Sequence, residues 1–334
     1  MRTKKCDVLY CGVDPEKIQK AHPKLIEGRF EIFTSFVKER YNIHIRKDVL
    51  KKKKPWTNDP ILQQYRFTNV RREHDTETKW VITHITSNFD LSYEDKLLNC
   101  ILFRLFNKHE TAELLGMPIE FSKDWNPEDY RHLFKEALED DPKRVFFTGA
   151  FNTGGLKRAL KWYLPKDDPE GDMNMRMLWF IKYLMNEGVC EEVSSCKSQK
   201  EVVDLMCSFI GLGRFLSYQI FVDFTYIENF SFSENEYTVA GPGCRRGLEY
   251  LFQDRDGMSY EECLFWVRDN WNKLNYEYVK HEYNKIHMYE LFRDLPDWDR
   301  EMNVMSLENC FCEFSKYMKI KLGEGRTKRK YQGV

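Results

Sequence analysis

The strongest constraint on the fold is the helical spacing of apolar residues in several segments. Some of these segments are preceded by a residue of a type that caps the N-terminus of a helix. In KLIEGRFEIFTSFVKERY, residues 24–41, apolar or aromatic side chains occupy positions 25, 26, 30, 32, 33, 36 and 37, which is typical of an amphipathic helix. Ser92, Ser198 and Ser259 are each followed three residues later by Asp or Glu, the pattern of a capping box. We predict helices over 24–41, 92–116, 126–138, 172–187, 259–275 and 306–320.

Strand-like runs are few. WVITHI at 80–85 and RVFFTGA at 144–150 are the main candidates, and they cannot form a large sheet. The chain has no internal repeat and no low-complexity linker. We therefore predict a mainly α fold, with a helical domain over 28–320 in one or two lobes. A short extension, 1–27, precedes it and a polar, basic tail, 321–334, follows.

Charge excludes one class of function. Lys and Arg total 52 against 53 Asp and Glu, so a nucleic-acid site on this chain must be a local patch and not a general basic surface. No apolar run is long enough for a signal peptide or a membrane span, and we expect a soluble, cytoplasmic protein without a membrane partner. The ten cysteines are scattered without a C-x-x-C pair, which favours reduced, buried thiols over disulfides or zinc.

Residues 209–220, FIGLGRFLSYQI, suggest a helix-hairpin-helix within about 198–226. Gly211 and Gly213 permit a tight turn, Arg214 follows, and the small Ser217 allows two helices to pack closely. Free amides at the start of the second helix can bind a DNA phosphate. An ordinary helical turn with glycine caps is the alternative.

Helix-hairpin-helix DNA glycosylases share such a hairpin, but their catalytic residues are missing here. Those enzymes place an Asp about twenty residues beyond the hairpin, where this chain reads EYTVAGPG. The bifunctional enzymes place a Lys where this chain has Phe215. Base excision is therefore disfavoured, although the scaffold is compatible with it.

Two familiar chemical motifs are absent. FFTGAFNTGGLKRAL at 146–160 begins like a P-loop, but Gly155 and Leu156 stand where Lys and Ser or Thr are required. The chain also lacks H-E-x-x-H and the zinc-deaminase signature. We predict no ATP-binding P-loop and assign no metal ligand.

The stretch PWTNDPILQQYRFTNVRREHDTETKW, residues 55–80, crowds aromatic, amide, basic and acidic side chains together. Such a mixture suits a pocket that orients a base and neutralises a phosphate. Arg72 and Asp75 would share one face of a helical turn. A surface helix with salt bridges is the alternative. Residues 239–248, VAGPGCRRGL, add a second candidate, because glycines let backbone amides approach an anion beside Arg245 and Arg246.

Five segments together resemble one family. PWTNDPILQQYRFTNVRREHD, ILFRLFNKHETAELLG, GLGRFLSYQIFVDF, VAGPGCRRGL and LENCFCEFSKY are similar to the helical proteins that act on 5-hydroxymethyluracil in hypermodified phage DNA. This group is the α-glutamyl/putrescinyl-thymine pyrophosphorylase family, or 5-hydroxymethyl-deoxyuridine DNA kinase helical domain. The resemblance runs in order from about residue 28 to 331.

The resemblance implies a glycosylase-like helical fold that flips a modified thymine out of DNA. A separate P-loop kinase would phosphorylate the hydroxymethyl group, and the helical enzyme would then let an amine or amino acid displace pyrophosphate. The chain would thus be a transferase, with DNA, an amine donor and the kinase as partners. No cofactor is implied with certainty, although Mg²⁺ often accompanies pyrophosphate.

The implied chemistry assigns residues to roles. Arg72 and a carboxylate, Asp75 first or Asp223 second, would be catalytic, the carboxylate taking a proton from the incoming ammonium. Leaving pyrophosphate requires cations and oriented amides, for which we assign Arg104, Gly241, Gly243, Arg245 and Arg246.

The flipped base needs partners for its Watson–Crick edge and an aromatic face. Those assigned are Asn69, Asn107, Gln219, Trp56 and Phe67. The DNA backbone would meet Gly211, Gly213 and Arg214. Two alternatives remain open: a base-excision enzyme of glycosylase type, and a non-catalytic DNA-binding partner of a hydroxymethyluracil DNA kinase.

Overall fold

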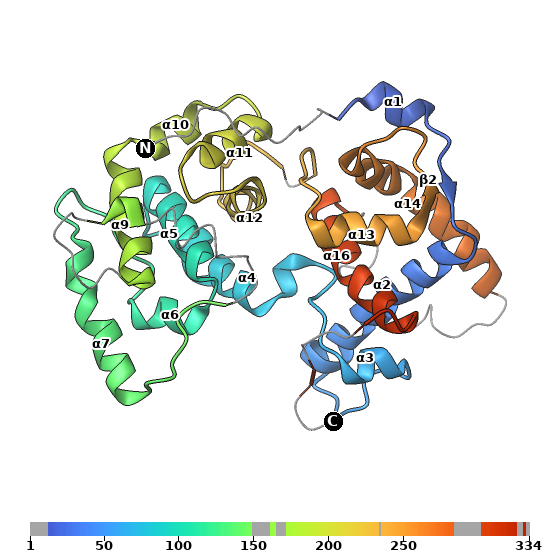
Figure 1. The fold of residues 1–334 in the computed structure, drawn as a ribbon, viewed down its shortest axis with the longest axis horizontal. Helices are drawn as coiled ribbons and strands as arrows, with labels where there is room; N and C mark the ends of the chain where they lie inside the picture. Colours follow the sequence, from blue (N-terminus) through green and yellow to red (C-terminus); the bar gives the residue numbers. More distant parts are fainter. Residues whose placement is uncertain are drawn as a thin grey trace. The chain divides into compact units, whose positions relative to one another are not determined.

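The computed structural model describes residues 13–148, 161–164, 172–233, 235–283, 302–325 and 330–331. The chain divides into two compact units (Figure 1). Unit 1 comprises Met1–Leu9 and Asp75–Glu236, and unit 2 comprises Tyr10–His74 and Tyr237–Val334. Helices dominate both units, and the sheet found in the described residues has two short strands. The predicted mainly α class is confirmed.

Unit 1 is built from helices of six to fourteen residues. They are α4 (Thr76–Val81), α5 (Tyr93–Phe106), α6 (His109–Leu114), α7 (Arg131–Asp140), α9 (Met173–Asn186), α10 (Val189–Ser195), α11 (Gln199–Ser208) and α12 (Arg214–Phe224). Short 3₁₀ helices cover Pro127–Tyr130 and Lys161–Tyr163, and a π-helix covers Ile82–Thr86.

Helix α5 is the centre of unit 1. Every residue from Lys96 to Phe106 is buried, and both α9 and α12 pack against this helix. Phe103 of α5 stacks on Trp80 of α4, with ring centroids 5.1 Å apart. A helix buried on all sides brings any polar side chain it carries into contact with other protein groups, because water cannot satisfy it there.

Unit 2 combines the first and last parts of the chain. Its elements are α1 (Pro15–Lys20), β1 (Lys24–Leu25), α2 (Arg29–His44), a π-helix (Ile45–Val49), α3 (Pro60–Gln64), a 3₁₀ helix (Arg72–His74), α13 (Pro242–Leu251), β2 (Phe252–Asp254), α14 (Tyr260–Tyr283) and α16 (Val304–Lys321). Strands β1 and β2 pair antiparallel. The rings of Phe33 and Phe311 stack in the core at 4.2 Å.

Helices α13 and α16 pack at very short range because α13 carries two glycines on the contact face. A Cβ atom at Gly247 would lie 2.1 Å from the carbonyl oxygen of Phe311. One at Gly243 would lie 2.6 Å from Cys312 Sγ. Only a residue without a side chain permits this approach. The VAGPGCRRGL stretch is therefore not a loop around Gly243: it becomes helix at Pro242, whose fixed φ suits a first helical position.

The structure corrects one predicted strand and two predicted helix boundaries. The 80–85 run is helical, since it ends α4 and continues as the π-helix Ile82–Thr86. The 24–41 helix starts only at Arg29, after Gly28 with φ +70°. The 92–116 helix is broken at Asn107, which adopts φ +51° between α5 and α6.

The cysteines largely follow the expectation of buried thiols. Cys100, Cys190, Cys244, Cys263 and Cys310 are free and buried, and burial raises the pKa of Cys100 and Cys244 well above the ordinary value. Cys207 departs from it, because it is disulfide-bonded. Across the described ranges, no helix has both the length and the apolar character needed to cross a membrane.

Candidate functional site

A buried ion pair in unit 1 joins the end of α5 to the end of α12. Arg104 Nε donates to Asp223 Oδ2 at 2.6 Å, and Arg104 Nη2 donates to Oδ1 at 2.5 Å. Asp223 is fully buried and Arg104 is 3% exposed. Planar, two-pronged pairing of this kind fixes orientation as well as charge. Asp223 therefore holds Arg104 in one position.

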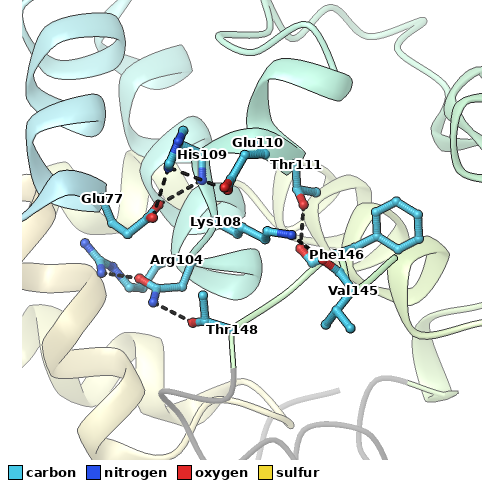
Figure 2. A network of polar contacts seen from close by, with 10 residues as sticks. Glu77, Arg104, Lys108, His109, Glu110, Thr111, Val145, Phe146 and Thr148 are labelled. Atoms are coloured by element: carbon cyan, nitrogen blue, oxygen red, sulfur yellow. Dashed lines mark hydrogen bonds and ion pairs between the residues drawn. The ribbon is translucent and has the colours of Figure 1, made fainter. Parts of the chain in front are cut away.

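Asn107 extends this pair toward the segment that ends at Thr148. Arg104 Nη1 donates to Asn107 Oδ1 at 2.6 Å, and Asn107 Nδ2 donates to Thr148 Oγ1 at 2.8 Å. Figure 2 shows Arg104 and Thr148 in this network. The left-handed backbone at Asn107, which asparagine tolerates well, turns its amide toward both partners. Thus Arg104, Asn107 and Asp223, assigned separately from sequence, lie in one polar network.

Asp223 keeps Arg104 in its charged form. Burial by itself would lower the pKa of Arg104, but the charge and hydrogen bonds of Asp223 outweigh it and raise the pKa. A buried guanidinium with a single carboxylate partner carries no excess charge. Both oxygens of Asp223 are committed to Arg104, so Asp223 suits a positioning role better than proton transfer.

Two side chains of the α6 segment bond to residues 145 and 146, and the described part of the 144–150 strand candidate, residues 144–148, forms no strand. Lys108 Nζ donates to the carbonyl of Val145 at 2.6 Å, and Thr111 Oγ1 donates to that of Phe146 at 2.6 Å. These bonds fix the chain up to Thr148. The P-loop-like residues 149–160, including Gly149 and Gly154, lie outside the described residues.

A second polar cluster in unit 1 contains one histidine and two glutamates (Figure 2). Glu77 comes from α4, and His109 and Glu110 begin α6. His109 Nδ1 is 3.0 Å from Glu77 Oε1 and 3.6 Å from Glu110 Oε2. Burial acts to lower the pKa of His109, but the hydrogen bond to Glu77 and the surrounding carboxylates raise it.

In unit 2, the backbone amides before α13 are occupied by buried glutamates. The amide of Ala240 donates to Glu261 Oε1 at 3.0 Å, and the amide of Gly241 donates to Glu308 Oε1 at 3.2 Å. Carboxylates are favourable at a helix N-terminus because its amides carry partial positive charge. Of the two glycines assigned to pyrophosphate, Gly241 thus has its amide bonded to a protein carboxylate.

Glu308 connects the two segments that were predicted to share a pocket. It lies on α16, is 5% exposed, and accepts from Gly241 while Arg72 is close enough to act on it electrostatically. Burial raises the pKa of Glu308 from 4.5 to about 7, although the Gly241 amide and Arg72 counteract it. The Arg72 segment and the start of α13 therefore both meet α16 within unit 2.

Arg245 and Arg246 lie in the first turns of α13 and are exposed. Arg245 Nε donates to the carbonyl of Ala240 at 2.9 Å, and its guanidinium carbon lies 5.5 Å from the centre of the Tyr260 ring. These contacts leave much of Arg245 open to solvent, since its side chain is 45% exposed. Both arginines can still reach an anion.

The aromatic and amide candidates of unit 2 are engaged in structural contacts. Phe67 packs edge-on against Phe36 at 5.6 Å. Trp56 Nε1 donates to the Lys52 carbonyl at 2.6 Å. Asn69 Nδ2 donates to the His74 carbonyl at 2.8 Å. A base would have to displace or supplement these contacts in order to use the same groups.

The 198–226 region forms two helices joined by residues 209–213. Gly211 adopts φ +107°, and Gly213 caps α12. Ser217 is fully buried, as close packing of the two helices requires. Arg214, assigned to the DNA backbone, instead donates from Nη2 to Asp204 Oδ1 at 3.0 Å. The turn matches the predicted glycine geometry, but its arginine is paired inside the protein.

Three assigned residues remain to be located in the structure: Asp75, Gln219 and Arg72. Asp75 is the N-cap residue of α4 and is half-buried, and its carbonyl accepts from Lys79 N at 2.8 Å. Gln219 is 6% exposed within α12. Arg72, the proposed partner of Asp75, belongs to unit 2.

The assigned residues fall into both units. Unit 1 holds Asp75, Arg104, Asn107, Gly211, Gly213, Arg214, Gln219 and Asp223. Unit 2 holds Trp56, Phe67, Asn69, Arg72, Gly241, Gly243, Arg245 and Arg246. Within each unit the structure gathers a subset: Arg104, Asn107 and Asp223 in the first, and Arg72 with the start of α13 in the second.

Sequence reasoning missed several polar residues. Glu261 and Glu308 are buried acids on amphipathic helices, and their occurrence on otherwise apolar faces is a signal that periodicity alone can reveal. Glu77, His109 and Glu110 had no such signal, because Glu77 lies 32 residues before its partner. Their proximity depends on how α4 and α6 pack.

The fold and these clusters define a mainly helical protein in which each unit contains buried polar groups bonded to one another. A model of the family described as 5-hmdU DNA kinase, helical domain, matches residues 27–327. The chain belongs to this family, and the resemblance found in the sequence is confirmed.

One curated relative gives the family context. The chain is 29% identical over 330 residues to the "5-hmdU DNA kinase" of Bacillus phage SP10. The match covers 93% of this chain but only 48% of the relative, so the chain spans about half the length of that protein. No solved structure matches the chain.

Proposed function

We propose that this chain acts on a 5-hydroxymethyluracil derivative in DNA as part of thymine hypermodification. The observation that carries the proposal is the family match across residues 27–327. The relative from Bacillus phage SP10, named as a kinase for 5-hmdU in DNA, supports the same substrate class. DNA containing the modified pyrimidine is then the principal partner.

The reaction proposed is displacement of pyrophosphate by an amine or amino acid. The amine nitrogen forms a bond to the methylene carbon of the base, the carbon–oxygen bond to pyrophosphate breaks, and the ammonium loses one proton. Leaving pyrophosphate needs cations. Arg245 and Arg246, exposed at the start of α13, support this role better than the Gly241 amide, which Glu308 already occupies.

Residue roles follow from the contacts. Asp75 is proposed as the group that takes the proton, because this residue is only partly buried. Arg104 is proposed as a positioning residue: Asp223 fixes its guanidinium, which in turn orients the Asn107 amide toward the phosphorylated base. Mg²⁺ is proposed only as an ion bound to the leaving pyrophosphate, and no protein ligand is assigned to it. A P-loop kinase, as a separate partner, would supply the phosphorylated base.

A single assay tests the proposal. The protein is mixed with DNA carrying pyrophosphorylated hydroxymethyluracil and a pool of amines and amino acids, and digested nucleosides are analysed by mass spectrometry. A new amine-substituted thymidine, formed with release of pyrophosphate, is expected. Unchanged nucleosides in the presence of tight DNA binding would favour a non-catalytic partner, and alkali-labile strand breaks would favour a glycosylase.

The kinase reaction itself is a second candidate, since the relative is named for it. The 146–160 segment of this chain lacks the P-loop lysine at the required spacing. We therefore expect no transfer of phosphate from labelled ATP to hydroxymethyluracil DNA by this chain alone. Transfer that survives further purification would instead assign the kinase reaction to the helical chain.

A further inference from the structure

Glu77, His109 and Glu110 bring two carboxylates and an imidazole close together in unit 1 (Figure 2). One potential ligand atom from each residue lies within 4.8 Å of the others. The set combines two separate segments, because Glu77 is on α4 whereas His109 and Glu110 are the first residues of α6.

The spacing suits a metal ion. With ligand bonds of about 2.1 Å, two ligand atoms lie about 3.0 Å apart at right angles and about 3.4 Å apart at a tetrahedral angle. His109 Nδ1 is 3.0 Å from Glu77 Oε1 and 3.6 Å from Glu110 Oε2. The third separation, between oxygens of Glu77 and Glu110, is no more than 4.8 Å, so side-chain rotation has to bring the three atoms around one ion.

Glu77 is already held in a suitable orientation. Its Oε2 accepts from the backbone amide of His109 at 2.8 Å, which leaves Oε1 directed at the imidazole. Such bonds around a ligating carboxylate increase affinity by fixing its geometry. Glu77 and His109 are each 27% exposed and Glu110 is 50% exposed, so water can enter and complete the coordination.

The local charge also favours a cation. Carboxylates of Glu77, Glu110 and Glu113 surround His109. The neighbouring cation, Lys108, donates to the Val145 carbonyl at 2.6 Å and points away from Glu77 (Figure 2). A doubly charged ion would offset the repulsion among these carboxylates.

We infer that Glu77, His109 and Glu110 form a binding site for one divalent transition-metal ion, such as Mn²⁺ or Co²⁺. An imidazole ligand suits first-row transition-metal ions better than Mg²⁺ and Ca²⁺, which prefer oxygen alone. This metal site is separate from the proposed transferase reaction. Metal binding can be measured without DNA, so its test does not depend on that reaction.

The test uses the full chain, free of any affinity tag and dialysed against a chelator. Mn²⁺ binding is followed by electron paramagnetic resonance, and Co²⁺ binding by visible absorption. The variants are Glu77→Gln, His109→Gln and Glu110→Gln. Glu113→Gln is the matched control, since Glu113 contributes charge near His109 but does not belong to the ligand set.

We expect one Mn²⁺ per chain, weakened at least about tenfold by each ligand substitution and less than about threefold by Glu113→Gln. Thermal melts identify any variant that is unfolded. Glu110→Gln keeps the test decisive, because the half-exposed Glu110 side chain is the least needed for folding. Absence of binding, or binding that all three substitutions leave unchanged, overturns the site.

Discussion

Arg104 and Asp223, 119 residues apart in the chain, form a bidentate ion pair inside unit 1, with both bonds at 2.6 Å or less. The pair joins α5 to α12 and, through Asn107, fixes the end of α5. The main role of this ion pair is structural, and any contribution of Arg104 to base binding depends on the pair being intact.

Breaking this pair should be costly. Asp223→Asn leaves the Arg104 guanidinium buried without its counter-charge, and we expect a loss of about 3–5 kcal/mol in the free energy of unfolding, measured by urea denaturation. Lys20→Gln, which breaks an exposed pair with Glu16, is the control and should cost less than about 1 kcal/mol. Equal, small effects of the two substitutions would mean that the buried pair does not hold α5 and α12 together.

Glu308 should make unit 2 sensitive to pH. Its pKa is raised by burial from 4.5 to about 7, so the folded protein keeps a proton that the unfolded chain releases. The stabilisation is fully present below pH 4.5 and is lost as pH rises through 7. The shift corresponds to about 3 kcal/mol. Other charged groups near Glu308 are Arg72, Glu313 and Lys316.

Glu308→Gln removes this titration while keeping an oxygen that can accept from Gly241. We expect the variant to melt at a higher temperature than the original protein at pH 8, and to lose that advantage at pH 5. Glu313→Gln, a buried acid of the same helix with its own Lys316 partner, is the control. A melting-temperature difference that does not change with pH would contradict a raised pKa at Glu308.

Gly247→Ala should disrupt the contact of α13 with α16. The new Cβ would lie 2.1 Å from the backbone oxygen of Phe311, which cannot rotate away. We expect destabilisation of about 3 kcal/mol or more, measured by thermal and chemical denaturation. Gly213→Ala meets nothing within 4 Å and should change stability by less than about 1 kcal/mol.

Arg245→Ala should slow product formation in the nucleoside assay about a hundredfold while leaving the fold intact. The side chain is 45% exposed, so its removal costs little stability, whereas losing a cation at leaving pyrophosphate costs about a hundredfold in rate. Arg268→Ala, another arginine of unit 2 that pairs with Asp269, should keep full activity. Unchanged turnover of the Arg245 variant would remove the start of α13 from the site.

The sequence by itself determined where many helices begin. Ser92, Ser198 and Ser259 cap α5, α11 and α14 as predicted, and Ser259 and Glu262 bond reciprocally. These helix starts can be predicted from sequence because capping and helical periodicity involve residues only a few positions apart.

Only the tertiary structure decided which polar groups meet. It paired Arg104 with Asp223, gave the Gly241 amide to Glu308, and placed Glu77 against His109. It also made helix of the β-branched run at 80–85, because packing outweighs weak local propensity. Buried polar atoms form hydrogen bonds with whichever groups packing brings close to them. Because such a partner can lie a hundred positions away in the chain, the local sequence does not predict it.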